Sequence, residues 1–364
     1  MILIRIFTYL LIMFTWHFST VHAQEEWPLT DFSKTTIDMS EVLSGGPPKD
    51  GIPAIDKPEF LSFNQAKNWI GESEPVIALE HKGVAKAYPL QILIYHEIVN
   101  DVIANLKVAV TFCPLCNASI VFNRSVQGNL LSFGTTGRLR NSDLIMYDRQ
   151  TESWWQQFEG EGIVGRYAGE ILEQVPSQII SFKNYQTLYP NGKVLSRNTG
   201  FSRPYGNNPY PGYDDINNVP FLMKNTIDKR LPPMERVIGV TLDGKTKLYP
   251  FSKLEDKQIL QDDSFNGIVI FSTGQVNSAL DKRKIGHSKL TRTYAVYDAS
   301  LDGKIINFRY ENGKLLDRKT KSEWLVTGKA VSGQHKGRQL KKLNYGEHFA
   351  FAWLAFKPDA IIFR

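Results

Sequence analysis

The sequence predicts a β-rich α+β fold made of two tandem copies of one small sheet-like or barrel-like unit. Short runs of β-branched and aromatic residues alternate with Gly and Asn turns, a pattern typical of strands. The second half of the chain repeats motifs of the first half in the same order. A long stretch rich in Tyr, Pro and Gly lies between the halves and indicates a connecting loop. These observations favour two small β units over one large sheet.

The amino terminus has the pattern of a secretory signal peptide. Arg5 precedes a short apolar run, and Val21-His22-Ala23 offers a cleavage site before Gln24. The apolar run is too short for a stable membrane span. We therefore expect residues 1–23 to be removed and the mature protein to be secreted or periplasmic. In such a compartment thiols oxidise unless a metal or a redox partner holds them.

The composition is that of a globular protein that does not bind nucleic acid. Of the 364 residues, 42% are hydrophobic and 22% are charged, and the formal net charge is +6. No cluster of Lys and Arg stands out, so we expect no nucleic-acid partner. The chain has no phosphate loop, HExxH motif or Ser-His-Asp arrangement, and the expected partner is an unidentified small-molecule substrate.

The repeat divides the chain after the signal peptide. We predict a polar N-terminal extension at 24–75, a first copy at 76–195, a connecting loop at 196–235 and a second copy at 236–364. The matching motifs are VIALEHKGVAKAYPLQIL and VIGVTLDGKTKLYPFSKL, VAVTFCPLCNAS and IVIFSTGQVNSA, and DRQTESWW and DRKTKSEW. Because both copies share the last motif, its Asp, Thr and Ser are expected to form turn hydrogen bonds and its Trp to lie in a core. The aromatic-rich loop is expected to fold over the first copy.

The chain's two cysteines, Cys113 and Cys116, lie in the segment VAVTFCPLCNASIVFNR. Apolar runs on both sides predict a strand–turn–strand. A thioredoxin-type pair needs a helix after the first thiol, and no helix signal follows here. The pattern is instead typical of a knuckle that directs both sulfurs to one metal. Asn117 then stands where a left-handed residue is needed.

Residues found in the first copy alone are the better candidates for function. At the position of the cysteine motif the second copy reads Thr273-Gly274-Gln275-Val276, and it also lacks a counterpart of His96-Glu97. The joint absence suggests that the two features form one site. His96 is interpreted either as a third metal ligand or as a satisfied core histidine. Glu97 would fix the imidazole tautomer or lie on the surface.

Two further segments supply pocket candidates. The segment FGTTGRLRNSDLIMYD adds Arg138, Ser142 and Asp143, and it either lines a pocket or forms a longer hairpin. In the connecting loop, one arginine and three tyrosines either bind a ligand or simply pack the loop: Arg203, Tyr205, Tyr210 and Tyr213. The remaining mature histidines are interpreted as surface residues: His81, His287, His335 and His348.

Several of these motifs together resemble a bacterial family, domain of unknown function 3179. CPLC is preceded by YHEIVND and followed by DRQTESWW and PYPGY, and the resemblance covers about residues 60–364. The family usually reads Thr-Tyr-Cys-Pro-Leu-Cys-Gly, where this chain has Phe112 and Asn117. The resemblance implies no established activity. It does imply a shared pattern made of His96, Cys113, Cys116, Tyr205, Tyr210 and Tyr213.

The leading hypothesis is a secreted metal-binding protein, with redox catalysis as an open function. Cys113, Cys116 and His96 would be the ligands, and one coordination position would remain open. Copper or zinc fits such a set, with iron less favoured. One alternative is a thiol–disulfide or structural disulfide protein. The other is a non-catalytic binding module, for example for carbohydrate, with a cleft lined by the loop tyrosines and Trp154.

Overall fold

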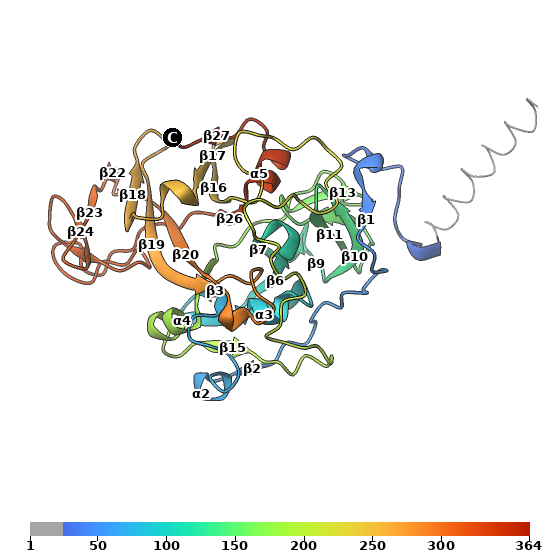
Figure 1. The fold of residues 1–364 in the computed structure, drawn as a ribbon, viewed down its shortest axis with the longest axis horizontal. Helices are drawn as coiled ribbons and strands as arrows, with labels where there is room; N and C mark the ends of the chain where they lie inside the picture. The colour runs from blue at the N-terminus through green and yellow to red at the C-terminus, as the bar shows by residue number, and fades with distance from the viewer. Residues whose placement is uncertain (1–24) are drawn as a thin grey trace, which may run out of the picture.

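The computed structural model describes residues 25–364, and the predicted signal peptide lies outside them. Strands hold 40% of the residues and helices 11%, in several small sheets with no closed barrel among the described residues. The β-rich α+β class predicted from the sequence is therefore confirmed. No helix within this part of the chain is long and apolar enough to cross a membrane. Figure 1 shows the first half in blue to green and the second half in orange to red.

The first half begins with a sheet of order β14-β3-β4-β15-β2. Its strands alternate in direction except that β15 runs parallel to β4. Short helices follow β4 and β14. The bounds are β2 (Phe60–Leu61), α2 (Phe63–Ala66), β3 (Pro75–His81), β4 (Val84–Pro89), α3 (Leu90–Leu93), β14 (Gln178–Ser181), α4 (Phe182–Leu188) and β15 (Lys193–Leu195).

Two more sheets complete the first half. The antiparallel sheet β5-β6-β7 carries the cysteines, and the sheet β1-β10-β11-β12-β13 lies beside it, with a small hairpin β8-β9. The bounds are β5 (Ile98–Ile103), β6 (Leu106–Cys113), β7 (Ala118–Asn123), β8 (Ser125–Val126), β9 (Asn129–Leu130), β10 (Phe133–Arg140), β11 (Asp143–Asp148), β12 (Trp154–Gln156) and β13 (Glu161–Val164).

The second half has the same kinds of sheet. The order β26-β16-β17-β27 and its strand directions match those of β14-β3-β4-β15. Sheets β18-β19-β20 and β23-β24-β25 follow, with a hairpin β21-β22. The bounds are β16 (Arg236–Leu242), β17 (Lys245–Pro250), β18 (Ile259–Asp262), β19 (Ile268–Asn277), β20 (Leu290–Asp298), β21 (Ser300–Leu301), β22 (Lys304–Ile305), β23 (Phe308–Glu311), β24 (Lys314–Asp317), β25 (Glu323–Trp324), β26 (Tyr345–Phe349), α5 (Ala350–Phe356) and β27 (Ile361–Ile362).

Matching polar contacts stabilise both halves. Tyr88 and Lys86 both bind the carboxylate of Asp101, with the tyrosine oxygen 2.7 Å from it. In the second half Tyr249, Lys247 and Asp262 make the same contacts. The shared DRxTxS motif forms turns, because Asp148 accepts hydrogen bonds from Thr151 and Asp317 accepts them from Thr320. Trp155 and Trp324 are buried, so this motif serves the fold as the sequence predicts.

The first sheet of each half packs against a three-stranded sheet of the other half. Strand β26 of the second half packs against β7 of the first, and β14 of the first packs against β19 and β20 of the second. One hydrophobic cluster therefore contains residues of both halves, including Phe122, Phe349 and Trp353. This packing places the segment that follows the cysteines directly against the second half.

The N-terminal extension packs on the first half. Its strand β1 (Leu43–Ser44) pairs with β10, next to a short 3-10 helix, η1 (Met39–Glu41). The ring of Trp27 lies edge-on to Tyr147 and Trp154, at centroid distances of 5.0 and 5.2 Å. Trp154 is only 2% exposed. The expectation that it lines an open carbohydrate cleft is therefore wrong, because the extension covers it.

Candidate metal centre

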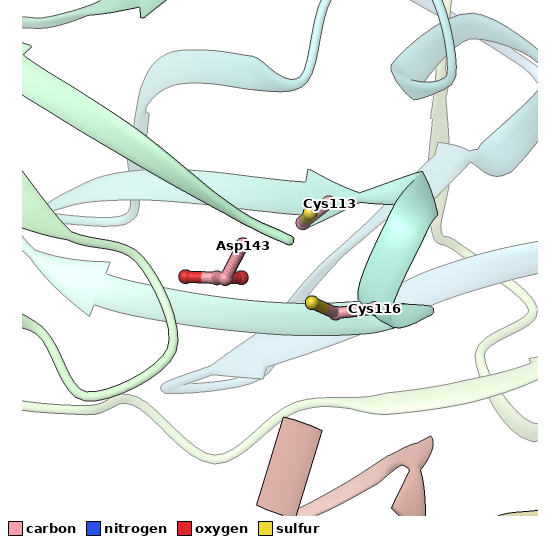
Figure 2. A group of neighbouring side chains, drawn as sticks. All are labelled: Cys113, Cys116 and Asp143. Atoms are coloured by element: carbon pink, nitrogen blue, oxygen red, sulfur yellow. The ribbon is translucent and has the colours of Figure 1, made fainter. Parts of the chain in front are cut away.

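The cysteines lie on a tight turn between two strands, as the sequence predicts. Cys113 ends β6, a 3-10 turn η2 (Pro114–Cys116) follows, and Cys113 pairs with Ala118 at the start of β7. Asn117 has φ 50° and ψ 32°, the left-handed conformation expected after such a turn. Its backbone N–H donates to the carbonyl of Pro114 at 3.1 Å. The turn brings both sulfurs to the same side of the sheet, as Figure 2 shows.

Asp143 reaches the sulfurs from the tip of a second hairpin. Strands β10 and β11 are joined by the two-residue turn Asn141-Ser142, with φ values of 51° and 65°. Two successive left-handed residues are typical of the type I′ turn that matches strand twist. This turn directs Asp143 at the knuckle (Figure 2), and its carboxylate oxygen and the two sulfurs all lie within 4.8 Å of one another.

The two oxygens of Asp143 have different surroundings. Oδ2 accepts hydrogen bonds from Gln156 Nε2 at 2.7 Å and from the backbone N–H of Phe158 at 2.9 Å. Oδ1 is buried and has no hydrogen-bond partner among residues 25–364. The Cys113 and Cys116 thiols lie close enough to lower the pKa of this carboxyl, but neither meets hydrogen-bond geometry at Oδ1. One oxygen is therefore fixed by the protein, and the other remains for a ligand.

Burial and mutual repulsion act on all acidic groups of this site. Burial raises the pKa of the Cys113 and Cys116 thiols, and of Asp143 to about 7. Burial and then the charge of Asp143 raise the pKa of Glu97 to about 8. The neighbouring charges that act most strongly on these groups are negative. A bound cation would remove this repulsion and would favour the ionised ligands.

The connecting loop lies against the metal centre. Tyr210 and Tyr213 pack against the hydrophobic cluster that contains both cysteines. Burial raises the pKa of both phenols, and the charges of Glu97 and Cys113 add to the effect at Tyr210. The loop is also held by Asn225 Nδ2, which donates to Asn141 Oδ1 at 2.9 Å. The expectation that the loop folds over the first copy agrees with these contacts.

His96 lies in a neighbouring hydrogen-bond chain. Its Nδ1 is 2.7 Å from the carbonyl oxygen of Pro53, and its Nε2 is 2.6 Å from the hydroxyl of Tyr205. The Tyr205 hydroxyl in turn lies 2.6 Å from Thr199 Oγ1. Both ring nitrogens are therefore engaged, and Asp143 is the residue whose possible ligand atom lies near the sulfurs. That His96 binds the metal stays a prediction.

Neither Arg138 nor Arg203 makes a hydrogen bond with Cys113 or Cys116 in the described part of the chain. Arg138 forms an ion pair with Glu26 at 3.1 Å and lies over the ring of Trp154. Arg203 is exposed. Burial lowers the pKa of His96, and the charge of Arg203 lowers it further. Glu97, Tyr210 and Tyr213 surround the cysteines, whereas Arg138 serves the N-terminal extension.

The second half lacks each ligand. Thr273 and Val276 stand at the cysteine positions, and Lys314 follows the Asn312-Gly313 turn where Asp143 follows Asn141-Ser142. From the sequence, Asp143 is a pocket or hairpin residue. Its absence from the second half is a signal that it shares with His96, so that signal does not distinguish the two. His348 was interpreted as a surface residue, which is wrong: it is 2% exposed because β26 packs against β7.

Comparisons with known proteins identify the family alone. No curated protein and no solved structure matches the chain. One family model matches residues 49–360, which include the knuckle, Asp143, the connecting loop and most of the second half. The match spans far more than half of the chain. The chain therefore belongs to the family described as Protein of unknown function (DUF3179).

Proposed function

We propose that this chain is an extracytoplasmic metal-binding protein in which Cys113, Cys116 and Asp143 hold one transition-metal ion. The observation that carries the proposal is the buried cluster of Cys113, Cys116 and Asp143, in which the two sulfurs and one carboxylate oxygen all lie within 4.8 Å of one another. The Oδ1 atom of Asp143 also has no hydrogen-bond partner in the described chain. Thiolate and carboxylate ligands at this separation suit a four-coordinate ion. Three protein ligands leave one position for water or a substrate.

Zinc fits this ligand set better than copper. Two thiolates alone suit either metal, but a carboxylate is a hard ligand that monovalent copper does not favour. Zinc binds sulfur and carboxylate oxygen together in four-coordinate sites. A zinc ion with an open position would polarise a bound substrate or activate a water molecule, so we propose Lewis-acid chemistry and keep redox chemistry with copper as the second candidate.

The buried thiols argue against a thiol–disulfide function. Both cysteines are free and buried. A redox-active thiol needs a lowered pKa and an accessible position. Burial raises the pKa of both thiols here, which is the opposite arrangement. A metal that binds the thiolates would supply the missing positive charge.

Metal analysis of the mature protein, purified without chelator, tests the proposal. We expect one metal ion per chain, and none in the Cys113→Ser, Cys116→Ser variant. Cobalt-loaded Asp143→Asn should retain sulfur-to-metal charge transfer but bind the ion more weakly. Thr273→Ser, at the matching place in the second half, is the control and should bind normally. Equal metal content in the wild type and the double cysteine variant would overturn the proposal.

A further inference from the structure

A second site lies where the two halves meet. A cavity of about 230 Å³ opens between β26 and α5 of the second half and the segment after β12 of the first. His348 and Trp353 line it together with Phe158, whose ring centroid lies 5.1 Å from His348 and 4.9 Å from Trp353. Phe158 separates this cavity from Asp143, to which its backbone N–H donates.

The cavity depends on two glycines that face each other. Gly239 of β16 pairs with Gly346 of β26. A Cβ atom at Gly239 would overlap the ring of Trp353, and one at Gly346 would overlap the ring of His348. The two rings stack at 5.3 Å with an interplanar angle of 13°. The absence of side chains on the sheet therefore makes room for two flat polar rings.

The first half provides an internal control for these positions. In the sheet of the first half, the pair Ala78 and Gln178 takes the place of the two glycines. The pair Val76 and Ile180 takes the place of Val237 and His348, so Ile180 stands at the position of His348. Tyr185 of α4 stands where Trp353 stands in α5, and its hydroxyl donates to the carbonyl of Lys193. The fold is therefore compatible with an apolar residue at the position of His348. The imidazole is not required by the sheet itself.

Three polar atoms of His348 and Trp353, two residues that line this cavity, have no hydrogen-bond partner among the described residues. The described chain supplies no hydrogen bond to His348 Nδ1, His348 Nε2 or Trp353 Nε1. The backbone of Ser119 lies close enough to His348 to raise the pKa of its imidazole. It does not meet hydrogen-bond geometry at either ring nitrogen. His348 is 2% exposed and Trp353 is 8% exposed. A buried polar group without a partner is destabilising, so native proteins rarely leave three together.

The charges around the cavity select an uncharged ligand. Burial lowers the pKa of His348 to about 3, so the ring is neutral and offers one donor and one acceptor. Lys357 and Glu159 form an ion pair at 2.6 Å on the cavity wall, and their charges cancel. A charged ligand would therefore be desolvated without a counter-charge. The amides of Gln174 and Asn344 add further donors and acceptors to the lining.

We propose that this cavity binds a small uncharged molecule with several hydroxyl groups, of the size of one sugar ring. Each hydroxyl group both donates and accepts a hydrogen bond, which matches a neutral imidazole, an indole N–H and two amides. Aromatic walls with a few convergent polar groups are the usual lining of small-molecule sites. The proposal does not depend on a metal at the cysteines.

Titration of the mature protein with free sugars tests the site. The probes are glucose, galactose and N-acetylglucosamine, with glucuronate as the charged counterpart. In protein with ¹⁵N-labelled tryptophan, the indole resonance of Trp353 is identified as the one that Trp353→Phe removes. This resonance should shift saturably when an uncharged probe is added and should not shift with glucuronate. His348→Ile, which installs the residue type of the first half, should abolish the shift, keep its metal and be at least as stable as the wild type.

Tyr185→Phe, at the position of the first half that matches Trp353, is the control and should bind the sugar unchanged. If His348→Ile fails to fold, calorimetric titration of Trp353→Phe carries the test, with at least a tenfold loss of affinity expected. The proposal is wrong if no uncharged probe moves the Trp353 resonance, since the cavity would then hold only water. It is equally wrong if glucuronate binds as glucose does, or if both variants retain binding.

Discussion

The side-chain amide of Asn117 donates a hydrogen bond of 2.8 Å to the backbone carbonyl of Glu347. Strand β26 thereby fixes Asn117, the residue after the second cysteine. The carboxyl of Glu347 in turn accepts a hydrogen bond from the backbone N–H of Tyr294 at 2.7 Å. No cluster of possible metal ligands lies in the described residues of the second half, yet this half holds the turn that presents Cys116. This contact gives the second half a structural role at the metal centre of the first.

Substitution of Asn117 should separate two roles of this residue. Asn117→Gly keeps the left-handed conformation but leaves the Glu347 carbonyl without its donor, so we expect a loss of about 1–3 kcal/mol in unfolding free energy. Asn117→Ala loses the same bond and must also adopt a positive φ, which costs an L-residue about 1–2 kcal/mol. Urea unfolding should therefore rank Ala below Gly. The reverse order would show that the turn does not need this conformation.

The stability of the metal-free protein should fall as pH rises from about 4 to 8. Folding raises the pKa of Asp143 to about 7 and of Glu97 to about 8, whereas the unfolded chain releases these protons near pH 4. The folded state therefore binds more protons across this range, and its unfolding free energy decreases with pH. Above both folded-state pKa values the loss is complete and levels off.

Metal should reverse this dependence, because it displaces the same protons and binds more tightly as pH rises. Urea unfolding at several pH values, with and without zinc, measures both trends. Asp143→Asn serves as the comparison, since it removes the contribution of one carboxyl and leaves those of Glu97 and Glu347, whose pKa values burial raises to about 8. A metal-free wild type whose pH dependence matches that of the variant would contradict the assignment of a raised pKa to Asp143.

The cysteine knuckle could be predicted because its signals are local. The apolar runs before Cys113 and after Cys116, and a tolerant residue at Asn117, define the strands and the turn between them within one short segment. The predicted connecting loop, residues 196–235, lies between strands β15 and β16 and contains no named helix or strand. Short-range patterns need no tertiary information.

The third residue of the cysteine cluster could not be chosen from the sequence, because tertiary packing brings it there. His96 and Asp143 are both absent from the second half, so the repeat favours neither. The type I′ turn at Asn141-Ser142 brings Asp143 to the sulfurs, whereas Pro53 and Tyr205 engage the ring of His96. The burial of His348 likewise arises from the contact of β26 with β7, which links distant segments.

Gln156→Leu should weaken metal binding about 10- to 100-fold, the usual effect of losing a partner that orients a ligand. Gln156 Nε2 donates to Asp143 Oδ2 at 2.7 Å and thus sets the direction in which Oδ1 points. Competition with a chromophoric chelator measures the affinity. Gln178→Leu, at another buried glutamine, is the matched control and should bind metal normally. Equal weakening in both variants would mean that the effect is one of general stability.

Tyr205→Phe should destabilise the protein without removing its metal. The carbonyl of Pro53 can only accept, so His96 Nδ1 carries the proton and Nε2 accepts from the Tyr205 hydroxyl. Loss of that hydroxyl leaves a buried ring nitrogen without a partner, which costs about 1–3 kcal/mol. Hydrogen exchange should also increase around Thr199, which shares the tyrosine oxygen.

His96→Gln completes this comparison, because it addresses the earlier prediction that the imidazole is a ligand. If Asp143 is the third ligand, the variant should retain one metal ion per chain and an unchanged cobalt spectrum, while Asp143→Asn alters both the affinity and the spectrum. A loss of metal in His96→Gln as large as that in Asp143→Asn would return His96 to the ligand set. It would also require the Tyr205 hydrogen bond to break when the metal binds.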